Sequence, residues 1–430
     1  MRPDDLFKNL SPDVTEAMID LANGGWLGLR FVTHQLLVRA GRHDEGREVL
    51  EKALAGAKDR ASQLSEGSQE WRDGWWLVRS YLVDLASLVR DQDAFEETDS
   101  LLVQSRDILS KLRGSDPNHP EKAEELNQWG SLLEAKGDYS GAETLYRQAL
   151  AIRTMMFTPD HPAVARVSNN LANALCSQRK FPEAESLYKS SLATRKKILG
   201  PEHEAVAIAL NNYARMLMGV KRYDEALELL DDSIASRLNT KGDEHPAMVN
   251  VLTTKSEIFR LQKRDDDALP WAMRALELAK KTVPDSKLTA VTHNNVALVF
   301  RAKEQSEAAE HYRVAITIGE KSPELREHPD LAVWYFNLAR MLGMQANYRD
   351  AQPFYENALA IQERSLGRDH PGTIRTRGWT ADTYEKLRLL DKAEPLWREV
   401  FESKQRVCGE HHKDVAWALK CWANVLVKQR

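Results

Sequence analysis

The amino-acid sequence predicts an all-α repeat array, in which similar pairs of helices follow one another along the chain. Three observations predict it: a histidine returns with a period of 42 residues, an alanine recurs in the first helix of each unit, and another alanine recurs in the second. Periods between about 20 and 50 residues are typical of arrays in which each unit packs only on its neighbours. We therefore expect the 430 residues to add repeats to one solenoid rather than to form separate globular domains.

Four segments follow one another along the chain. Residues 1–25 are a polar lead-in with one short helix, and residues 26–117 hold degenerate repeats, since GRHDEGREVLEKAL at 41–54 aligns with GDYSGAETLYRQAL at 137–150. Residues 118–407 hold the regular 42-residue repeats, and residues 408–430 supply a C-terminal capping helix near 414–428. From residue 26 onward we predict nine helix pairs and this closing helix, without a β-sheet.

Each regular unit carries a small residue in both helices and a large residue four positions after the second one. Residues at i and i+4 share a helix face, so this pattern predicts a stripe that packs into the neighbouring helix. The small residues of the first helices are Gly130, Ala172, Ala214, Ser256, Ala297, Ala339, Ala381 and Ala423. Those of the second helices are Ala142, Ala184, Ala226, Ala268, Ala308, Ala351 and Ala393, followed by Tyr146, Tyr188, Leu230, Ala272 as the exception, Tyr312, Tyr355 and Trp397.

The linkers between units carry signals for the end of one helix and the beginning of the next. Gly200-Pro201 ends a helix, because glycine tolerates a left-handed cap and proline cannot continue the helix. His161-Pro162 begins the next helix, since proline lacks an N–H that would be unpaired at that position. The linker at residues 283–286 has no histidine, so we expect its repeat to be the least regular one.

The recurring histidines could be mistaken for metal ligands. They are His119, His161, His203, His245, His328, His370 and His412. Packed helices lie about 8–10 Å apart, whereas zinc ligands lie about 2 Å from the metal, so these histidines cannot share one ion. We interpret them as linker residues. Cys408, His411, His412 and Cys421 are the remaining cluster of suitable ligands, and their spacing matches no common zinc site. We predict no metal and no cofactor.

Composition excludes several classes of function. The net charge is −4 and charged residues make up 29% of the chain, so bulk charge does not favour nucleic acid or an anionic membrane. No apolar run is long enough to span a membrane, and Met1 to Leu10 has no apolar signal-peptide region. Only three cysteines occur, which is typical of a reducing compartment. We therefore expect a cytoplasmic protein that binds neither nucleic acid nor membrane, while the oligomeric state is not predicted.

Enzyme signatures are also missing from the sequence. It contains no G-x-x-x-x-G-K-[ST], no G-x-S-x-G and no H-E-x-x-H, and no glycine-rich turn that could hold a phosphate. We predict no catalytic residues and no enzymatic activity.

The regular repeats resemble a known family. SNNLANALCSQRKFPEAESLYKSSL and LNNYARMLMGVKRYDEALELL resemble tetratricopeptide repeats, and the 42-residue period, the His-Pro linkers and the Asn-Asn pairs resemble the kinesin-light-chain subgroup. The resemblance extends from about Asn118 to Arg406 and is weaker from Trp26 to Ser115. It implies a right-handed superhelix of antiparallel helix pairs, with a concave groove that binds a peptide or protein. Residues 1–70 lack the sustained heptads of a motor-binding coiled coil, so the resemblance concerns the repeat module alone.

One face of the first helices is the candidate binding surface. Arg166, Asn169, Asn173 and Cys176 lie at i, i+3, i+7 and i+10 and so share a face, which predicts a ladder of asparagines along the groove. Asparagine carries a donor and an acceptor and can pair with the backbone of an extended peptide. The second asparagines of each pair, including Asn170 and Asn337, are interpreted as structural residues that bond a loop backbone. The candidate residues are Asn127, Arg166, Asn169, Asn173, Asn211, Arg215, Arg260, Asn294, Arg301 and Arg340.

The arginines of this face leave two interpretations open. They could bind the carboxylates of an acidic, extended partner segment, which the planar guanidinium group fits well. Alternatively, they could pair with Glu134, Glu257, Asp382 or Glu385 on nearby helices. The sequence thus predicts a non-enzymatic interaction scaffold or adaptor that binds a peptide segment of a partner. The alternative function is a ligand-sensing regulatory module whose effector is another chain or domain.

Overall fold

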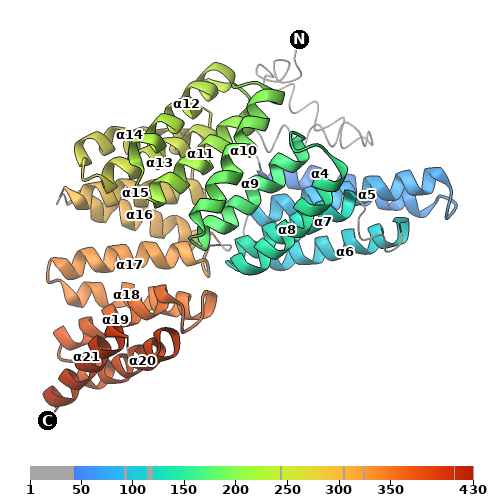
Figure 1. Ribbon diagram of the computed structural model, residues 1–430. Coiled ribbons are helices and arrows are strands. Elements are labelled where there is room, and N and C mark those ends of the chain that lie inside the picture. The colour runs from blue at the N-terminus through green and yellow to red at the C-terminus, as the bar shows by residue number, and fades with distance from the viewer. Residues whose placement is uncertain are drawn as a thin grey trace. The chain divides into compact units, whose positions relative to one another are not determined.

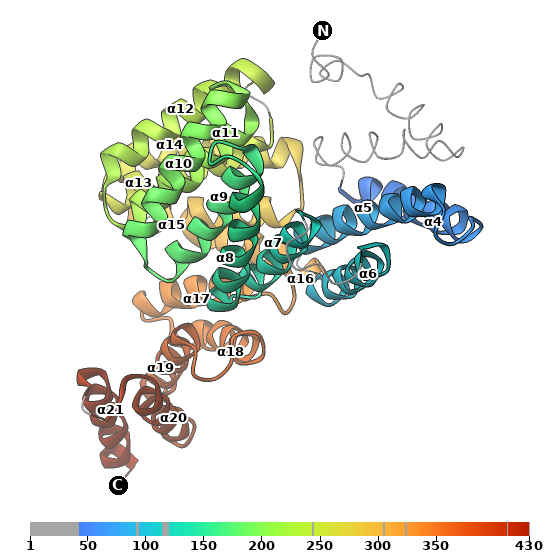
Figure 2. The same ribbon diagram turned by 45° about the vertical axis from the view of Figure 1, so that its right-hand side comes forward.

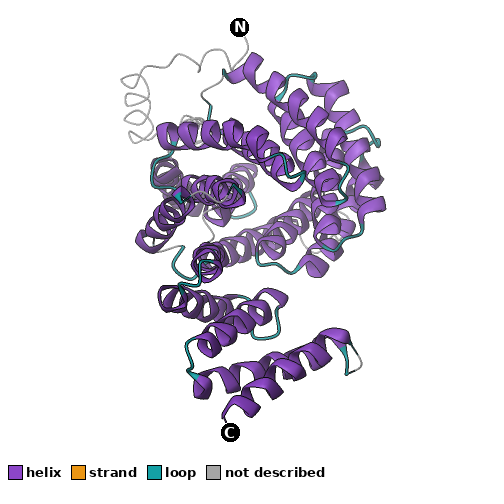
Figure 3. Cartoon of the chain, turned by 90° about the vertical axis from the view of Figure 1, so that its left-hand side faces the viewer, coloured by secondary structure: helices purple, strands orange, loops and turns teal. Residues whose placement is uncertain are grey.

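The computed structural model describes residues 43–91, 94–113, 120–242, 245–303, 306–322, 325–410 and 412–429. These residues form eighteen helices and no strand (Figure 3). The prediction of an all-α solenoid of antiparallel helix pairs is confirmed. The predicted lead-in at 1–25, the first helix of the first predicted pair, His119 and His411 lie outside the described residues. The segment boundaries at 25, 117 and 407 remain predictions.

The chain divides into two compact units, Met1–Val251 and Leu252–Arg430, and the boundary lies within one helix. The described part of the first unit contains α4 (His43–Ser62), α5 (Gln69–Asp91), α6 (Phe95–Arg113), α7 (Pro120–Ala135), α8 (Tyr139–Met156), α9 (Pro162–Ser177), α10 (Phe181–Leu199), α11 (Glu204–Gly219) and α12 (Tyr223–Lys241). Its helices are coloured blue to green in Figure 1. Here α4 is the second helix of the first predicted pair, and α5/α6 to α11/α12 are complete pairs.

The second unit begins within α13 (Ala247–Leu261). It continues with α14 (Asp265–Thr282), α15 (Lys287–Ala302), α16 (Glu307–Lys321), α17 (Pro329–Met344), α18 (Tyr348–Ser365), α19 (Pro371–Lys386), α20 (Leu390–Cys408) and α21 (Lys413–Gln429). Figure 2 shows α21, the last helix, beside α20. The closing helix predicted near 414–428 is therefore confirmed.

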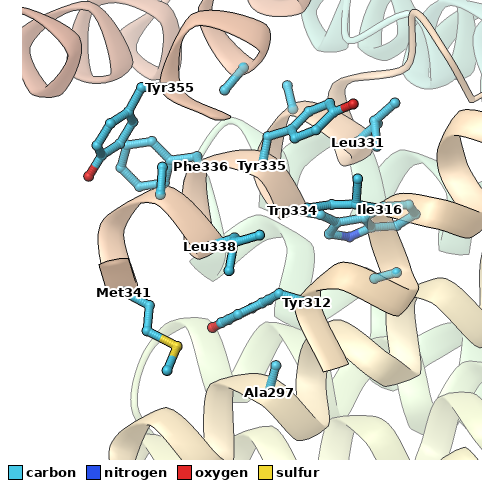
Figure 4. Packing of buried hydrophobic residues seen from close by; sticks show 14 of the residues in the cluster. Ala297, Tyr312, Ile316, Leu331, Trp334, Tyr335, Phe336, Leu338, Met341 and Tyr355 are labelled. Atoms are coloured by element: carbon cyan, nitrogen blue, oxygen red, sulfur yellow. The ribbon is translucent and has the colours of Figure 1, made fainter. Parts of the chain in front are cut away.

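The stripe of small and large residues forms the core, as predicted. Ala142, Tyr146 and Ala184 are completely buried, and their counterparts in the second unit are buried as well. Gly130 shows why the first-helix position is small, because a Cβ there would lie 2.7 Å from the ring of Tyr146. In the second unit, Trp334, Leu338 and Tyr312 pack in one cluster with Ala297 (Figure 4).

The linker histidines have a definite structural role, which the sequence interpretation missed. The Nδ1 atom of His161 accepts a hydrogen bond from the backbone N–H of Ala163 at 3.2 Å. The same bond, two residues along, is made by His203, His245, His328, His370 and His412. In the repeat without the histidine, Ser286 Oγ accepts from the backbone N–H of Thr289 instead. These side chains therefore act as N-caps, each satisfying one of the unpaired donors of a helix start.

The linker glycines have the positive φ that was expected. Gly200 has φ 84° and ψ 157°, and Gly242, Gly367 and Gly409 have similar φ values. The ψ value differs from that of the expected left-handed cap and places Gly200 in a region of backbone space that is open essentially to glycine alone. Replacement of this residue by any other would strain the linker.

Candidate binding surface

Most of the candidate asparagines lie between the repeats rather than on an accessible face. Asn127, Asn169 and Asn294 are only 2%, 4% and 7% exposed, and Asn211 is half-buried. We expected Asn169, Asn211 and Asn294 to be accessible, and this is wrong for Asn169 and Asn294; Asn127, another candidate of the groove, is buried as well. Asn173 is half-buried and accepts a hydrogen bond from the hydroxyl of Tyr188 at 2.5 Å, so it too serves its own repeat.

Hydrogen bonds between neighbouring first helices explain this burial. Asn170 Nδ2 on α9 donates to Asn127 Oδ1 on α7 at 3.0 Å. In the second unit, Asn337 Nδ2 on α17 donates to Asn294 Oδ1 on α15 at 2.9 Å. Asn170 and Asn337 are thus structural, but the partner of each is the asparagine of the preceding repeat and not a loop backbone. We call these two hydrogen bonds between asparagines of successive first helices the asparagine ladder.

Loss of a ladder bond is expected to destabilise the first unit. Asn127→Ala leaves the half-buried amide of Asn170 without its acceptor, which should cost about 1–3 kcal/mol. Asn211→Ala is the matched control, because it lies at the same repeat position and its Oδ1 atom accepts no hydrogen bond. Urea unfolding followed by circular dichroism should show a clear loss for the first variant and a smaller one for the second. Equal losses would contradict a structural role for the ladder.

In the first unit, one candidate arginine is already paired. Arg166 Nη1 donates to Glu124 Oε1 at 3.0 Å, and its second nitrogen contacts the other carboxylate oxygen. Arg153 also contacts Glu124, at 3.2 Å. Burial raises the pKa of Glu124, but the hydrogen bond and charge of Arg166 outweigh it, so the pKa lies below its usual value. The internal-pairing interpretation therefore holds for Arg166, although with a different carboxylate from those expected. Arg215 is exposed.

In the second unit, two of the three candidate arginines lack such partners. Arg301 and Arg340 are half-buried, and neither forms an ion pair with any carboxylate in the described part of the chain. Arg301 Nη1 and Arg340 Nε are buried atoms without a hydrogen-bond acceptor. Burial, with the nearby charges of Arg340 and Arg260, lowers the pKa of Arg301. Arg260 pairs with Glu257 at 3.8 Å, one of the carboxylates expected as internal partners. The charges of Arg301 and Arg340 are therefore the ones that no ion pair compensates within the described residues.

Aromatic rings adjoin these arginines, and sequence reasoning did not include them. The guanidinium of Arg340 lies 6.0 Å from the ring centroid of Trp379, and that of Arg375 lies 5.2 Å from the ring of Phe336. Trp379 is 38% exposed and stacks on Tyr355. Phe336 occupies the repeat position of Asn294, and Trp379 that of Asn337, so the replacement of ladder asparagines by aromatic residues was the available signal. We call Arg260, Arg301, Arg340, Arg375 and Trp379 the arginine–aromatic surface, beneath which Phe336 is buried.

Neither a metal site nor a membrane span accompanies this surface. Within the described ranges, no group of three or more histidine, cysteine, aspartate or glutamate side chains could hold a metal ion. The histidine Nδ1 atoms are instead used as helix caps. No described helix combines the length and apolar character that crossing a membrane requires.

Comparisons with known proteins agree with this architecture. The family model described as "Tetratricopeptide repeat" matches residues 122–197, 163–235, 205–281, 249–321 and 330–389. Among curated proteins, no sequence matches the chain. The apo form of the quorum sensor NprR from B. thuringiensis has a TM-score of 0.55 and 13% identity, covering 86% of this chain and 99% of that one.

Two similar structures come from kinesin-light-chain-like proteins. BtubC (BKLC) from P. vanneervenii is 21% identical, with a TM-score of 0.44 over 54% of this chain and 91% of that one. A putative kinesin light chain of Podospora anserina with nearly identical repeats is also 21% identical, with a TM-score of 0.41 over 48% of this chain and 98% of that one.

Proposed function

The chain belongs to the tetratricopeptide repeat family, and from this premise we propose that it is a protein-interaction scaffold that binds an extended, acidic segment of a partner. One observation carries the proposal: Arg301 and Arg340 lie half-buried on the first helices of the second unit without a carboxylate partner. Burying cations without compensation is unfavourable, so an external anion that neutralises them gains free energy on binding.

The aromatic side chain of this surface favours a peptide with acidic side chains over a free anion as the ligand. Trp379 is partly exposed and its ring lies beside Arg340, so an apolar group adjoins the charged groups of this surface. An extended segment with acidic and apolar residues would complement it. The buried asparagines Asn127, Asn169 and Asn294 are left out of this proposal, because their side chains are engaged between repeats or inaccessible. The binding surface is therefore placed on α13, α15, α17 and α19.

We further propose that the protein is a non-catalytic, cytoplasmic protein, which its three free cysteines support. The second candidate function is a ligand-sensing regulatory module. The similarity in fold to the quorum sensor NprR favours keeping it, although at 13% identity that similarity concerns the fold alone. A change in limited proteolysis of the chain on peptide binding would favour the sensor, and an unchanged pattern would favour the scaffold.

Salt dependence tests the proposed acidic segment. A fluorescein-labelled peptide of alternating glutamate and leucine should bind the full chain, with glutamine in place of glutamate as the control. Because partly exposed charge pairs are screened by salt, raising the concentration from about 50 mM to about 500 mM should weaken the first peptide at least roughly tenfold. Fluorescence anisotropy measures both affinities. Equal binding of the two peptides, or binding that salt leaves unchanged, would exclude an acidic partner.

A further inference from the structure

Four repeats carry a tyrosine at the same position of the second helix, but the surroundings of its hydroxyl differ between the two units. In the first unit, the Tyr146 hydroxyl donates to Glu134 Oε2 at 2.8 Å and lies 3.0 Å from Ser131 Oγ. Tyr188 donates to Asn173 Oδ1 at 2.5 Å. In the second unit, Tyr312 and Tyr355 are 0% and 1% exposed, and neither hydroxyl has a hydrogen-bond partner.

The first helices of the second unit explain the missing partners. Repeat register places Arg301 at the position of Glu134, and Arg340 at the position of Asn173. Both acceptors are therefore replaced by arginine, which can only donate. Arg301 Nη1, Arg340 Nε and the hydroxyls of Tyr312 and Tyr355 are all buried atoms without a hydrogen-bond partner. A buried polar group without a partner typically costs about 1–3 kcal/mol, so retaining two such hydroxyls calls for an explanation.

The geometry brings these groups to one side of the core. In Figure 4 the hydroxyls of Tyr312 and Tyr355 point to the same side of the cluster, whereas Tyr335 points its hydroxyl to the other side. Tyr335 has its own acceptor, Glu320. Burial raises the pKa of Tyr312 to about 12, while the charges of Arg301, Arg260 and Arg340 act in the opposite direction. All three arginines are thus close enough to act on that hydroxyl.

Space beside one hydroxyl remains open. A Cβ atom at Gly343 would lie 3.8 Å from the Tyr355 hydroxyl oxygen and within 4 Å of no other atom outside the local backbone. Gly343 stands at the repeat position of Arg301, so a side chain that would otherwise cover Tyr355 is absent. Tyr355 also feels the negative charge of Asp382, and we therefore expect Tyr312 to contribute more to the binding of an anion.

We propose that the hydroxyls of Tyr312 and Tyr355, with Arg260, Arg301 and Arg340, form an oxyanion site that binds an acidic group of the partner segment. This inference rests on the proposed function and specifies its chemistry. The oxyanion supplies the acceptor that hydroxyls and guanidinium groups lack, and hydrogen bonds to an ionised acceptor are shorter and stronger than neutral ones. A glutamate or aspartate carboxylate and a phosphorylated side chain share this chemistry.

Stability of the free protein gives the first test, and it needs no partner. Tyr312→Phe removes a hydroxyl that has no bond, so the melting temperature should stay unchanged or rise. The matched control is Tyr146→Phe, which removes a hydroxyl bonded to Glu134 and should lower the melting temperature. If Tyr312→Phe lowers the melting temperature as much as the control does, the hydroxyl is bonded in the free protein and the inference fails.

Binding gives the second test, with the glutamate–leucine peptide described above as the probe. The Kd of Tyr312→Phe for this peptide should rise at least about tenfold, because a bond to a charged acceptor is lost. Tyr355→Phe should raise it by a smaller factor, and Tyr146→Phe should leave it unchanged. A Tyr312→Phe variant that binds as tightly as the unmodified chain would overturn the inference. A phosphoserine–leucine peptide, measured alongside, shows which oxyanion the site prefers.

Inorganic phosphate separates failure of this inference from failure of the proposed function. Thermal unfolding of the full chain in phosphate, compared with chloride at equal ionic strength, should show stabilisation that Tyr312→Phe reduces. If no peptide binds but this stabilisation is observed, the oxyanion site stands and the peptide-binding function falls. If phosphate stabilises both proteins equally, or neither, the oxyanion site is wrong even where the peptide binds.

Discussion

Replacing both Arg301 and Arg340 by glutamate is expected to weaken binding of an acidic peptide about a hundredfold or more, without lowering the melting temperature. Like charges placed against each other across an interface cost several kcal/mol, which accounts for the loss of affinity. Stability should be kept because neither arginine has an ion pair to lose within the described residues, and burial, with the nearby charge of Arg340, lowers the pKa of Arg301. Arg301→Glu also places a glutamate at the repeat position of Glu134, where its carboxylate would accept a hydrogen bond from the Tyr312 hydroxyl.

Arg166→Glu is the matched control for this charge reversal. Its guanidinium is bound to Glu124, so the substitution sets two carboxylates against each other in the first unit. We expect a lower melting temperature there and unchanged affinity for the peptide. Anisotropy titrations and thermal unfolding on the same preparations measure both quantities. A lowered melting temperature with undiminished affinity in the Arg301/Arg340 variant would show that these arginines are structural.

Acidification from pH 6.5 to pH 4 is expected to cost the second unit about 3 kcal/mol of stability through His293 alone. His293 is 3% exposed, and its Nδ1 atom lies 2.9 Å from Nδ1 of His311, on which Phe300 stacks. Burial, with the charges of His311 and Lys280, lowers the pKa of His293 to about 4. The unfolded chain, with the ordinary value of 6.5, takes up a proton first as the pH falls. The contribution is therefore complete above pH 6.5 and lost progressively down to about pH 4.

The measurement is the urea midpoint of the second unit between pH 7 and pH 4. His293→Gln should flatten the curve in this range, because glutamine does not titrate. Glu307 and Glu310 act in the opposite direction on His311, and the pKa of His311 is nevertheless lowered by burial. Hydrogen exchange, read at amides of each unit, distinguishes the stability of the second unit from that of the first. This distinction is needed because burial raises the pKa of Asp84 in the first unit to about 6, so the first unit also responds to pH. A slope that His293→Gln leaves unchanged would assign the pH dependence to other groups.

The repeat period predicted most of the fold, because it reports directly on packing. The alanine and tyrosine positions are buried where the register placed them, and the last helix ends within one residue of the expected position. The caps were less accessible to prediction. Through Nδ1, a histidine just before a helix can accept a hydrogen bond from the backbone N–H two residues on. Histidine is not among the usual capping residues, so the pattern indicated only a linker.

The face of the first helix was harder to predict than its existence. Asn169 and Asn173 share a face by spacing, yet that helix is covered by its own second helix and by neighbouring repeats, so the accessible strip is narrow. Asn169 lies outside this strip and is buried between neighbouring repeats. Pairing of Arg166 was predictable in principle, because Glu124 precedes it by one period of 42 residues and thus occupies the same position in the repeat before. Opposite charges at the same position of two successive repeats therefore predict an internal ion pair. The signal is seen only when neighbouring repeats are aligned with each other.

The asparagine ladder also restricts how a chain of this kind can change in length. Each ladder bond joins residues 43 positions apart, one repeat plus one residue, in both units. Duplicating or deleting a whole repeat outside a bonded pair leaves the two bonded asparagines at the same spacing. An insertion of a few residues within a first helix turns each following side chain about 100° per residue around the axis and separates the partners. Evolution by gene duplication thus conserves the interior bonding automatically, whereas a short insertion, though a smaller change in sequence, disturbs it more.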